Sequence, residues 1–270
     1  MTNIPKTKEC ILELKDNWLT IWFNRPNKRN ALSKRLLNEI GITLSSIEND
    51  RVIRGVIFRG KNKVFCSGMD LEEIKDISLT GEKAREKAIG ISRIVGSTFE
   101  QINKAPQITV SAVEGAGMAG GFGIACATDI LVSMSDAKYA LTETKIGLTP
   151  VQIAPYIINR LGYEKARKLM LFGTAFNGKK AFKIGMADYL AETIEEFETH
   201  LNDVKDMVLQ CSPIAVSLTK RVLSENSTLS IEESAKLFAS SLVDGDGFEG
   251  LASFFEKRRP RWSIDSKSKK

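Results

Sequence analysis

Two glycine-bearing segments of this sequence could do chemistry, because each follows a predicted buried strand and each opens a predicted helix. The segments are Val64–Asp70 (VFCSGMD) and Gly115–Gly123 (GAGMAGGFG). The first amides of a helix have no partner within it and lie at the positive end of the helix dipole. Two such turns brought together predict an oxyanion hole made of backbone, suited to a carbonyl or thioester oxygen that gains charge as an enolate or a tetrahedral adduct forms.

Histidine is almost absent from the chain, since His200 is the only one. It falls in a polar helical stretch far along the chain from both glycine turns, so we expect it on a solvated helix face. Its isolation excludes the usual general base, the Ser-His-Asp and Cys-His arrangements, and most catalytic zinc sites. Carboxylates must therefore move the protons of any reaction.

The composition predicts one sizeable core. The chain has 270 residues, of which 43% are hydrophobic. No apolar run approaches the ~20 residues that a bilayer crossing needs, and residues 1–6 carry no apolar signal region, so we expect neither a membrane partner nor export. The cysteines lack paired spacing, which predicts reduced thiols in a cytoplasm and supports neither a zinc site nor a disulfide framework. These cysteines are Cys10, Cys66, Cys126 and Cys211.

The net charge of +6 is modest, and part of it lies in a tail around Lys267, Lys269 and Lys270. Such a balance favours an anionic small ligand over nucleic acid as the partner.

Strands and helices are predicted to alternate as far as about residue 190, and helices alone follow. Residues 10–14, 18–23, 52–58, 107–113, 129–134 and 138–141 have the pattern of strands. Helices are predicted after Ser33, at 82–103, up to 127, after 150, and at 195–210, 213–223, 231–243 and 248–258. We therefore expect an α/β core at 1–192 and a helical C-terminal region at 193–270, with no linker between them.

Four motifs, in this order and spacing, resemble the enoyl-CoA hydratase/isomerase, or crotonase, superfamily, and the likeness runs nearly from end to end. The motifs are Asn24–Ser33, Phe65–Leu71, Gly115–Asp129 and Glu143–Gly147. Phe254–Pro260 also resembles the terminal signature of that family. The resemblance implies an α/β, crotonase-like spiral of ββα repeats with a helical C-terminal region that builds homotrimers, often paired into hexamers. It also implies an acyl-CoA thioester substrate, with coenzyme A as part of that substrate and no separate cofactor or metal.

The family's oxyanion hole would map onto the backbone N–H groups of Met69 and Gly120, which agrees with the physical reading of the two turns. Gly68 permits the sharp turn before Met69, and Gly120 and Gly121 leave the backbone open to a thioester.

The resemblance also implies a coenzyme A site. Its cationic side chains would meet phosphates and its backbone would meet the pantetheine, along Arg25, Lys28, Arg29, Ala31 and Leu32. The first and second turns add Cys66, Gly68, Asp70, Leu71, Gly117 and Gly121. Phe254 and Lys257 would reach the adenine end from an adjacent subunit.

Some of these residues also have structural explanations. Asp70 is placed to favour the dipole of its helix, Asp129 to anchor a strand, and Cys66 to fill space as a small apolar side chain. Phe254 and Lys257 would equally suit packing and solubility on an amphipathic helix.

The acid and base residues depart from the pattern that the family's hydratases usually show. They carry two glutamates, but the first position is Gly123 here and only the second, Glu143, is matched. Hydration uses a base for water and a proton donor for the α-carbon, which two carboxylates divide simply. Glu114 is a minor candidate for the missing carboxylate. We further hypothesise that Gly123 enlarges the pocket and removes a negative charge, which would admit a β-branched or carboxylate-bearing acyl group.

Three functions remain open on the sequence. Hydration of a 2-enoyl-CoA is favoured because residues 143–156 resemble the branch that hydrates methylglutaconyl-CoA and isohexenylglutaconyl-CoA. A double-bond isomerase would need only one carboxylate, which Gly123 favours. A non-catalytic acyl-CoA-binding or RNA-binding protein is the third alternative, and the presence of Glu143 counts against it, because mere binding needs no acid opposite an oxyanion hole.

Overall fold

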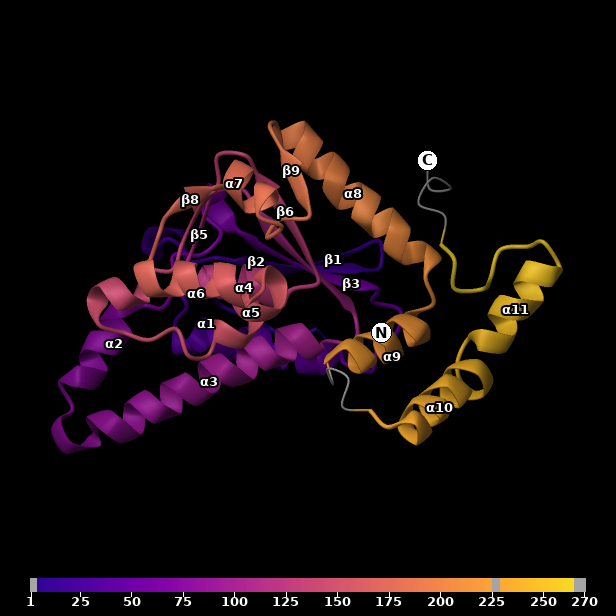
Figure 1. Ribbon diagram of the computed structural model, residues 1–270, viewed down its shortest axis with the longest axis horizontal. Coiled ribbons are helices and arrows are strands. Elements are labelled where there is room, and N and C mark those ends of the chain that lie inside the picture. Colours follow the sequence, from indigo (N-terminus) through magenta and orange to yellow (C-terminus); the bar gives the residue numbers. More distant parts are fainter. Residues whose placement is uncertain (1–3, 225–228, 265–270) are drawn as a thin grey trace.

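A six-stranded sheet forms the centre of the protein in the computed structural model, which describes residues 4–224 and 229–264 (Figure 1). Its strand order is β1-β2-β3-β4-β6-β9, with β1 and β2 antiparallel and all other neighbours parallel. The strands are β1 (Cys10–Lys15), β2 (Trp18–Phe23), β3 (Gly55–Gly60), β4 (Ile108–Val113), β6 (Ile130–Met134) and β9 (Tyr189–Ala191). The tail lysines 267, 269 and 270 lie outside the described residues.

A second, smaller sheet has three strands. It contains β5 (Ala116–Met118), β7 (Lys138–Ala140) and β8 (Phe176–Asn177), and a single bridge joins Cys66 to Gly117 beside it. The chain runs from a strand of the large sheet to a strand of the small sheet and then to a helix, as in β4-β5-α4 and β6-β7-α5. This recurring unit is the ββα repeat that the sequence predicted.

Helices cover both faces of the large sheet. Their bounds are α1 (Lys34–Ile47), α2 (Leu71–Ser78), α3 (Ala84–Lys104), α4 (Gly120–Ala127), α5 (Ala154–Leu161), α6 (Tyr163–Phe172), α7 (Gly178–Lys183), α8 (Ile194–Gln210), α9 (Pro213–Ser224), α10 (Ile231–Ala239) and α11 (Gly247–Phe255). The larger core joins one face to α1, α3 and α4, and the smaller core packs α8 on the other face around Trp18 and Phe197. Ser33 caps α1 as predicted, because its side chain accepts a hydrogen bond from Leu36 N.

The C-terminal helices leave the core in two steps. α8 still packs on the sheet, although the predicted domain boundary at residue 192 precedes it. α9 is fastened by Lys220, whose buried amine lies 2.5 Å from Asp129 and donates to Gln107 O. Beyond α9, the helices α10 and α11 lie to one side of the core (Figure 1).

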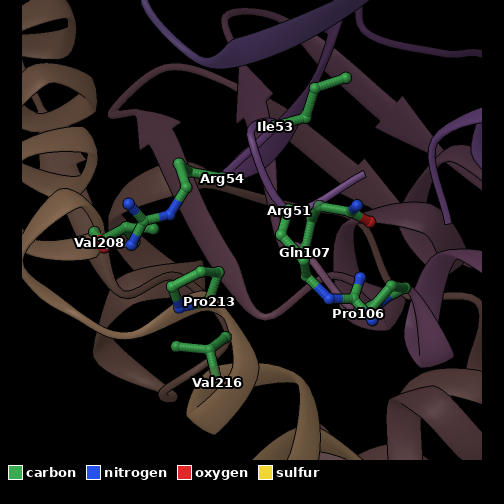
Figure 2. A pocket seen from close by; sticks show the side chains of 8 residues that line it. All are labelled: Arg51, Ile53, Arg54, Pro106, Gln107, Val208, Pro213 and Val216. Carbon is green, nitrogen blue, oxygen red and sulfur yellow. Dashed lines mark hydrogen bonds between the residues drawn. The ribbon is translucent and has the colours of Figure 1, made fainter. Parts of the chain in front are cut away.

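The third strand begins at residue 55 instead of the expected 52, directly after Arg54. Arg54 is 5% exposed, and its guanidinium turns back to donate to the carbonyls of Val208, Cys211 and Trp262 at the end of α8 and beyond it. Figure 2 shows this junction, where Pro213 and Val216 of α9 lie below Arg54. The cavity there has a volume of about 10 Å³, enough for about one water molecule and too small for a substrate.

The sequence predicted that His200 lies on a solvated helix face, and this prediction is wrong. Its ring packs against Tyr189 at 5.3 Å, and Nε2 lies 3.1 Å from Leu190 O. The polar composition of α8 concealed this contact, because the partner residues belong to β9.

Candidate active site

The first glycine turn is held by backbone pairing to two other segments. Cys66 N donates to Ala116 O, and Met118 N donates to Cys66 O, which ties this turn to β5. On the opposite side, Leu32 N donates to Gly68 O and Asp70 N donates to Leu32 O. Gly68 has φ of +97°, a conformation that favours glycine. The turn therefore presents Met69 N between two anchored residues.

The second turn contains a strained alanine immediately before its helix. Ala119 has φ 48° and ψ −114°, which is unusual for a residue with a side chain. It is fixed by a hydrogen bond from its own N to Ala140 O and by one that its carbonyl accepts from Gly123 N. These bonds orient the start of α4, and with it the amide of Gly120.

The two turns touch each other at their glycines. A Cβ at Gly68 would lie 2.8 Å from Ala119 Cβ and 3.5 Å from Gly120 N, while a Cβ at Gly120 would lie 3.7 Å from Gly68 Cα. Among the described residues, neither Met69 N nor Gly120 N donates a hydrogen bond. Two unused backbone donors thus lie on adjoining turns, which is the arrangement that an oxyanion hole needs.

Glu143 begins a 3₁₀ turn, Glu143–Ile146, close to the second glycine turn. The chain reaches it directly from Ala140, whose carbonyl accepts from Ala119 N. Its side-chain Oε2 is buried and has no hydrogen-bond partner within the described part of the chain. Burial raises the pKa of Glu143 above its usual value. A desolvated carboxylate with one oxygen left unpaired is suited to accepting and returning a proton.

Gly123 does not open a pocket, so the hypothesis of an enlarged cavity at this position is wrong. Gly123 is fully buried in α4. A Cβ there would lie 2.7 Å from Phe99 Cε1 and 2.8 Å from Ile153 Cβ, closer than real contacts allow. Apolar side chains from α3 and from the loop after Glu143 occupy the space that a glutamate would need, although the absence of a second negative charge remains.

Arg25 and Asp70, both expected near coenzyme A, are bound to each other. Arg25 Nη2 lies 2.7 Å from Asp70 Oδ2, and its Nε lies 3.3 Å from Glu9. Asp70 also caps α2 by accepting from Glu72 N. Burial alone would raise the pKa of Asp70, but the hydrogen bonds from Arg25 and from the amides of Glu72 and Glu73, together with the charge of Arg25, lower the pKa overall.

The rest of the predicted coenzyme A segment divides between surface and core. Ala31 and Leu32 are buried. Lys28 and Arg29 are exposed beside them, and Lys28 pairs with Glu72 at 2.7 Å, while Leu71 of α2 is 58% exposed.

The remaining predicted residues of the turns provide close packing. Cys66 is fully buried, and burial raises the pKa of its thiol to about 12, so it acts as the apolar filler that the sequence predicted. A Cβ at Gly121 would lie 2.5 Å from Cys66 O, and one at Gly117 would lie 3.2 Å from the Tyr139 ring. Gly121 thus lets the two turns approach each other, and Gly117 leaves room for the Tyr139 ring.

Glu114 forms an ion pair with Arg59 and does not replace the missing carboxylate. Its Oε1 lies 2.5 Å from Arg59 Nε, and Arg59 also pairs with Glu198 of α8. Asp129 anchors a strand as predicted, because it accepts from both the amide and the hydroxyl of Thr109.

Within residues 4–224 and 229–264, no group of three or more His, Cys, Asp or Glu side chains is placed to hold a metal ion.

Phe254 and Lys257 are not part of the site within one chain. Phe254 is 76% exposed at the end of α11, and Figure 1 shows α11 on the opposite side of the molecule from α2. No helix of the described residues is long and apolar enough to cross a bilayer.

Sequence reasoning missed Ala119, Phe99 and Ile153. A positive φ at an alanine has no local signature, because long-range hydrogen bonds impose it. Phe99 and Ile153 looked like ordinary apolar core residues, and only the fold brings them together over Gly123.

A model of the family described as "Enoyl-CoA hydratase/isomerase" matches residues 13–265. Among curated proteins, a "Putative enoyl-CoA hydratase" of Thermus thermophilus is 28% identical over 247 residues, covering 90% of this chain and 96% of that protein. The human "Methylglutaconyl-CoA hydratase, mitochondrial" is 28% identical and covers 90% of this chain and 73% of its own length.

Among solved structures, "Pseudomonas aeruginosa AtuE" superimposes with a TM-score of 0.90 at 32% identity, covering 95% of this chain and all of that one. The spiral of strands and helices described above is therefore shared with known proteins along almost its whole length.

Proposed function

Because the chain belongs to the enoyl-CoA hydratase/isomerase family, we propose that it adds water to a 2-enoyl-CoA thioester through an enolate held by Met69 N and Gly120 N. A protein of this family with hydratase-named relatives is an enzyme of the hydratase-like lyase kind that acts on acyl-CoA thioesters. The observation that carries the proposal is the pair of unused amides on two touching turns, with the unpaired Oε2 of Glu143 nearby.

The two amides donate to the thioester oxygen, and their bonds strengthen as that oxygen gains negative charge. Removing one such donor typically costs about 10²–10³ in rate. Because the donors belong to the backbone and are fixed by Leu32 and Ala140, they need little reorganisation as the charge develops.

Glu143 carries out both proton transfers of the hydration. Its carboxylate accepts a proton from water as the oxygen of that water bonds to C3, and the electron pair of the double bond moves toward the thioester oxygen. The protonated Glu143 then gives the proton to C2, and the carbonyl re-forms. The raised pKa of Glu143 suits this double role, because a desolvated carboxylate is more basic and its proton is easily held between the two steps.

Double-bond isomerisation by the same two groups is the second candidate function. The packing at Gly123 favours it, since Phe99 and Ile153 leave no room for a second carboxylate and isomerisation needs only one. Glu143 would remove a proton from one carbon and return it to another. A purely binding protein is disfavoured, because burying a carboxylate oxygen without a partner costs stability and serves nothing if no proton moves.

Substrates with a 3-branched or glutaconyl-type acyl group are the first to compare with crotonyl-CoA. The human relative named for methylglutaconyl-CoA supports this choice. The single acidic group also supports it, since an acyl group with its own carboxylate would meet only one negative charge near the hole.

Incubation of the protein with crotonyl-CoA and 3-methylglutaconyl-CoA in ¹⁸O-labelled water tests the reaction. Label at C3 in the product indicates hydration, and a shifted double bond without label indicates isomerisation. Glu143→Gln should lose both by at least about 10²-fold with coenzyme A affinity retained. Full activity of that variant would remove Glu143 from the mechanism.

The C-terminal helices complete the proposal by assembling the chain into homotrimers or pairs of trimers. Large apolar side chains on α10 and α11 are open to solvent in the single chain, including Ile231 at 91% and Phe255 at 75% exposed. A surface of this kind typically marks an interface between proteins. Phe254 and Lys257 of one subunit would then reach the coenzyme A of the next.

A further inference from the structure

Resting on the oxyanion hole of the proposed function, we propose that Arg25 and Asp70 are positioning residues that hold the Met69 amide in the direction which the thioester oxygen requires. They do so through the backbone, without touching the substrate. The sequence placed both residues at coenzyme A, whereas their contacts give them a different task.

Met69 has no hydrogen bond of its own through which its amide could be aimed, as far as the described residues show. Its direction is set by its two neighbours. Gly68 O accepts from Leu32 N at 2.7 Å, and Asp70 N donates to Leu32 O at 3.0 Å. Gly68 O and Met69 N belong to the same planar peptide group, so the bond from Leu32 N to Gly68 O also sets the direction of the Met69 N–H. Arg25 acts on this side, because it holds Ala31 O, which shares a peptide group with Leu32 N. On the other side, Asp70 N fixes the peptide group that follows Met69.

Asp70 is fixed by a desolvated ion pair. The side chains of Arg25 and Asp70 are only 13% and 8% exposed, and Arg25 Nη2 lies 2.7 Å from Asp70 Oδ2. Arg25 is itself held in place, since Nη1 donates to Ala31 O at 2.5 Å and Nε faces Glu9. Charges that are shielded from water attract each other more strongly than exposed ones, so this pair is a firm anchor.

The helix that follows Asp70 adds little to this anchor. Leu71 and Leu79, at the two ends of α2, are 58% and 73% exposed. Without the Arg25–Asp70 pair, the start of α2 would be held by its cap and by Glu73, which accepts from Lys34 N. We expect the Met69 amide then to lose its alignment with Gly120 N.

The same contacts argue against Arg25 as a phosphate ligand. Its guanidinium already serves two carboxylates and a carbonyl. Loss of a phosphate ligand would raise KM and leave kcat unchanged, whereas a misaligned amide lowers kcat with little change in KM. Kinetics thus separate the two roles.

Asp70→Asn is the test variant, because asparagine caps a helix as well as aspartate and has nearly the same shape. With its oxygen still accepting from Glu72 N, the asparagine places its amide nitrogen where Oδ2 accepted from Arg25, so both the charge and the hydrogen bond opposite Arg25 are lost. We expect kcat to fall about 10-fold, less than the loss of a whole oxyanion donor, with KM within about 2-fold. Glu72→Gln is the matched control. It breaks the Lys28–Glu72 pair between the same two segments, but those side chains are 45% and 76% exposed, so the turnover should not change.

A spectroscopic measurement separates this proposal from the proposed function on which it rests. Crotonyl-CoA with ¹³C at its carbonyl is bound to Glu143→Gln, and the carbonyl stretch is recorded. Donation by the two amides lowers its frequency, and in the double variant Glu143→Gln/Asp70→Asn we expect a clearly smaller lowering at unchanged binding.

Each outcome decides one claim. No lowering in Glu143→Gln would overturn the oxyanion hole itself. A lowering that is identical with and without Asp70→Asn, or an Asp70→Asn variant in which only KM changes, would overturn the positioning role and leave the hole intact.

Discussion

Gly123→Ala tests why this protein works with one carboxylate. In an open helix interior, replacing glycine by alanine stabilises by about 1 kcal/mol. At Gly123 the new Cβ would lie 2.7 Å from Phe99 Cε1 and 2.8 Å from Ile153 Cβ, so the core must shift. Overpacking of this kind costs about 1–3 kcal/mol. The net expectation is a destabilisation of about 0–2 kcal/mol.

Gly90→Ala provides the matched control within the same chain. Gly90 also lies inside a helix, α3, but a Cβ there would have no atom within 4 Å. It should therefore stabilise by about 1 kcal/mol. The difference between the two variants, about 1–3 kcal/mol, is the packing cost at Gly123 alone. Thermal unfolding of all variants at one protein concentration measures it, because any assembly makes the Tm depend on concentration.

A double-mutant cycle identifies the neighbour responsible. Ile153→Ala alone should cost about 2–5 kcal/mol, since it removes buried methyl groups. Combined with Gly123→Ala, the loss should be about 1–2 kcal/mol smaller than the sum of the single losses, because the new methyl group fills the space that isoleucine leaves. If Gly123→Ala stabilises as much as Gly90→Ala does, the position is open, and the case for a single carboxylate would lose its structural basis.

Four further predictions concern the charges and the oligomer. Because burial raises the pKa of Glu143, kcat/KM should fall as the pH drops through that raised value, where the carboxyl gains a proton and can no longer accept one from water. The raised pKa also means that the native state binds more protons than the unfolded state, so the stability contributed by Glu143 falls as the pH rises. The Tm of Glu143→Gln should therefore increase relative to that of the wild type from pH 4 to pH 7. A Tm difference that stays constant over this range would contradict the raised pKa. Lys220→Met should lower the free energy of unfolding, measured by chemical denaturation, by about 3 kcal/mol, because it leaves Asp129 without its ion-pair partner. The double variant Lys220→Met/Asp129→Asn should recover part of this loss. A loss below about 1 kcal/mol would refute the anchoring of α9 by Lys220. Phe254→Ser should weaken self-association in sedimentation on dilution, whereas a wild type that sediments as a monomer would refute the trimer.

The features that the sequence predicted correctly depend on residues that lie close together in the chain. Ser33 begins a helix because its hydroxyl accepts from an amide three residues on, and local spacing reveals that. The two glycine turns were recognisable for the same reason, because Gly68 comes three residues before the start of α2 and Gly120 opens α4.

The features that the sequence concealed depend on partners far along the chain. The polar composition around His200 gave no hint of Tyr189, and nothing near Arg25 in the sequence indicated its ion pair with Asp70. Gly123 suggested space because a missing side chain is visible in the sequence, whereas the residues that fill it are not.

A crystal structure of Glu143→Gln with crotonyl-CoA tests the central claim most directly. We predict the thioester oxygen at about 2.7–3.1 Å from both Met69 N and Gly120 N, with the residue 143 side chain next to C2 and C3. A thioester oxygen bound away from either amide, or a residue 143 side chain turned from the acyl group, would contradict it.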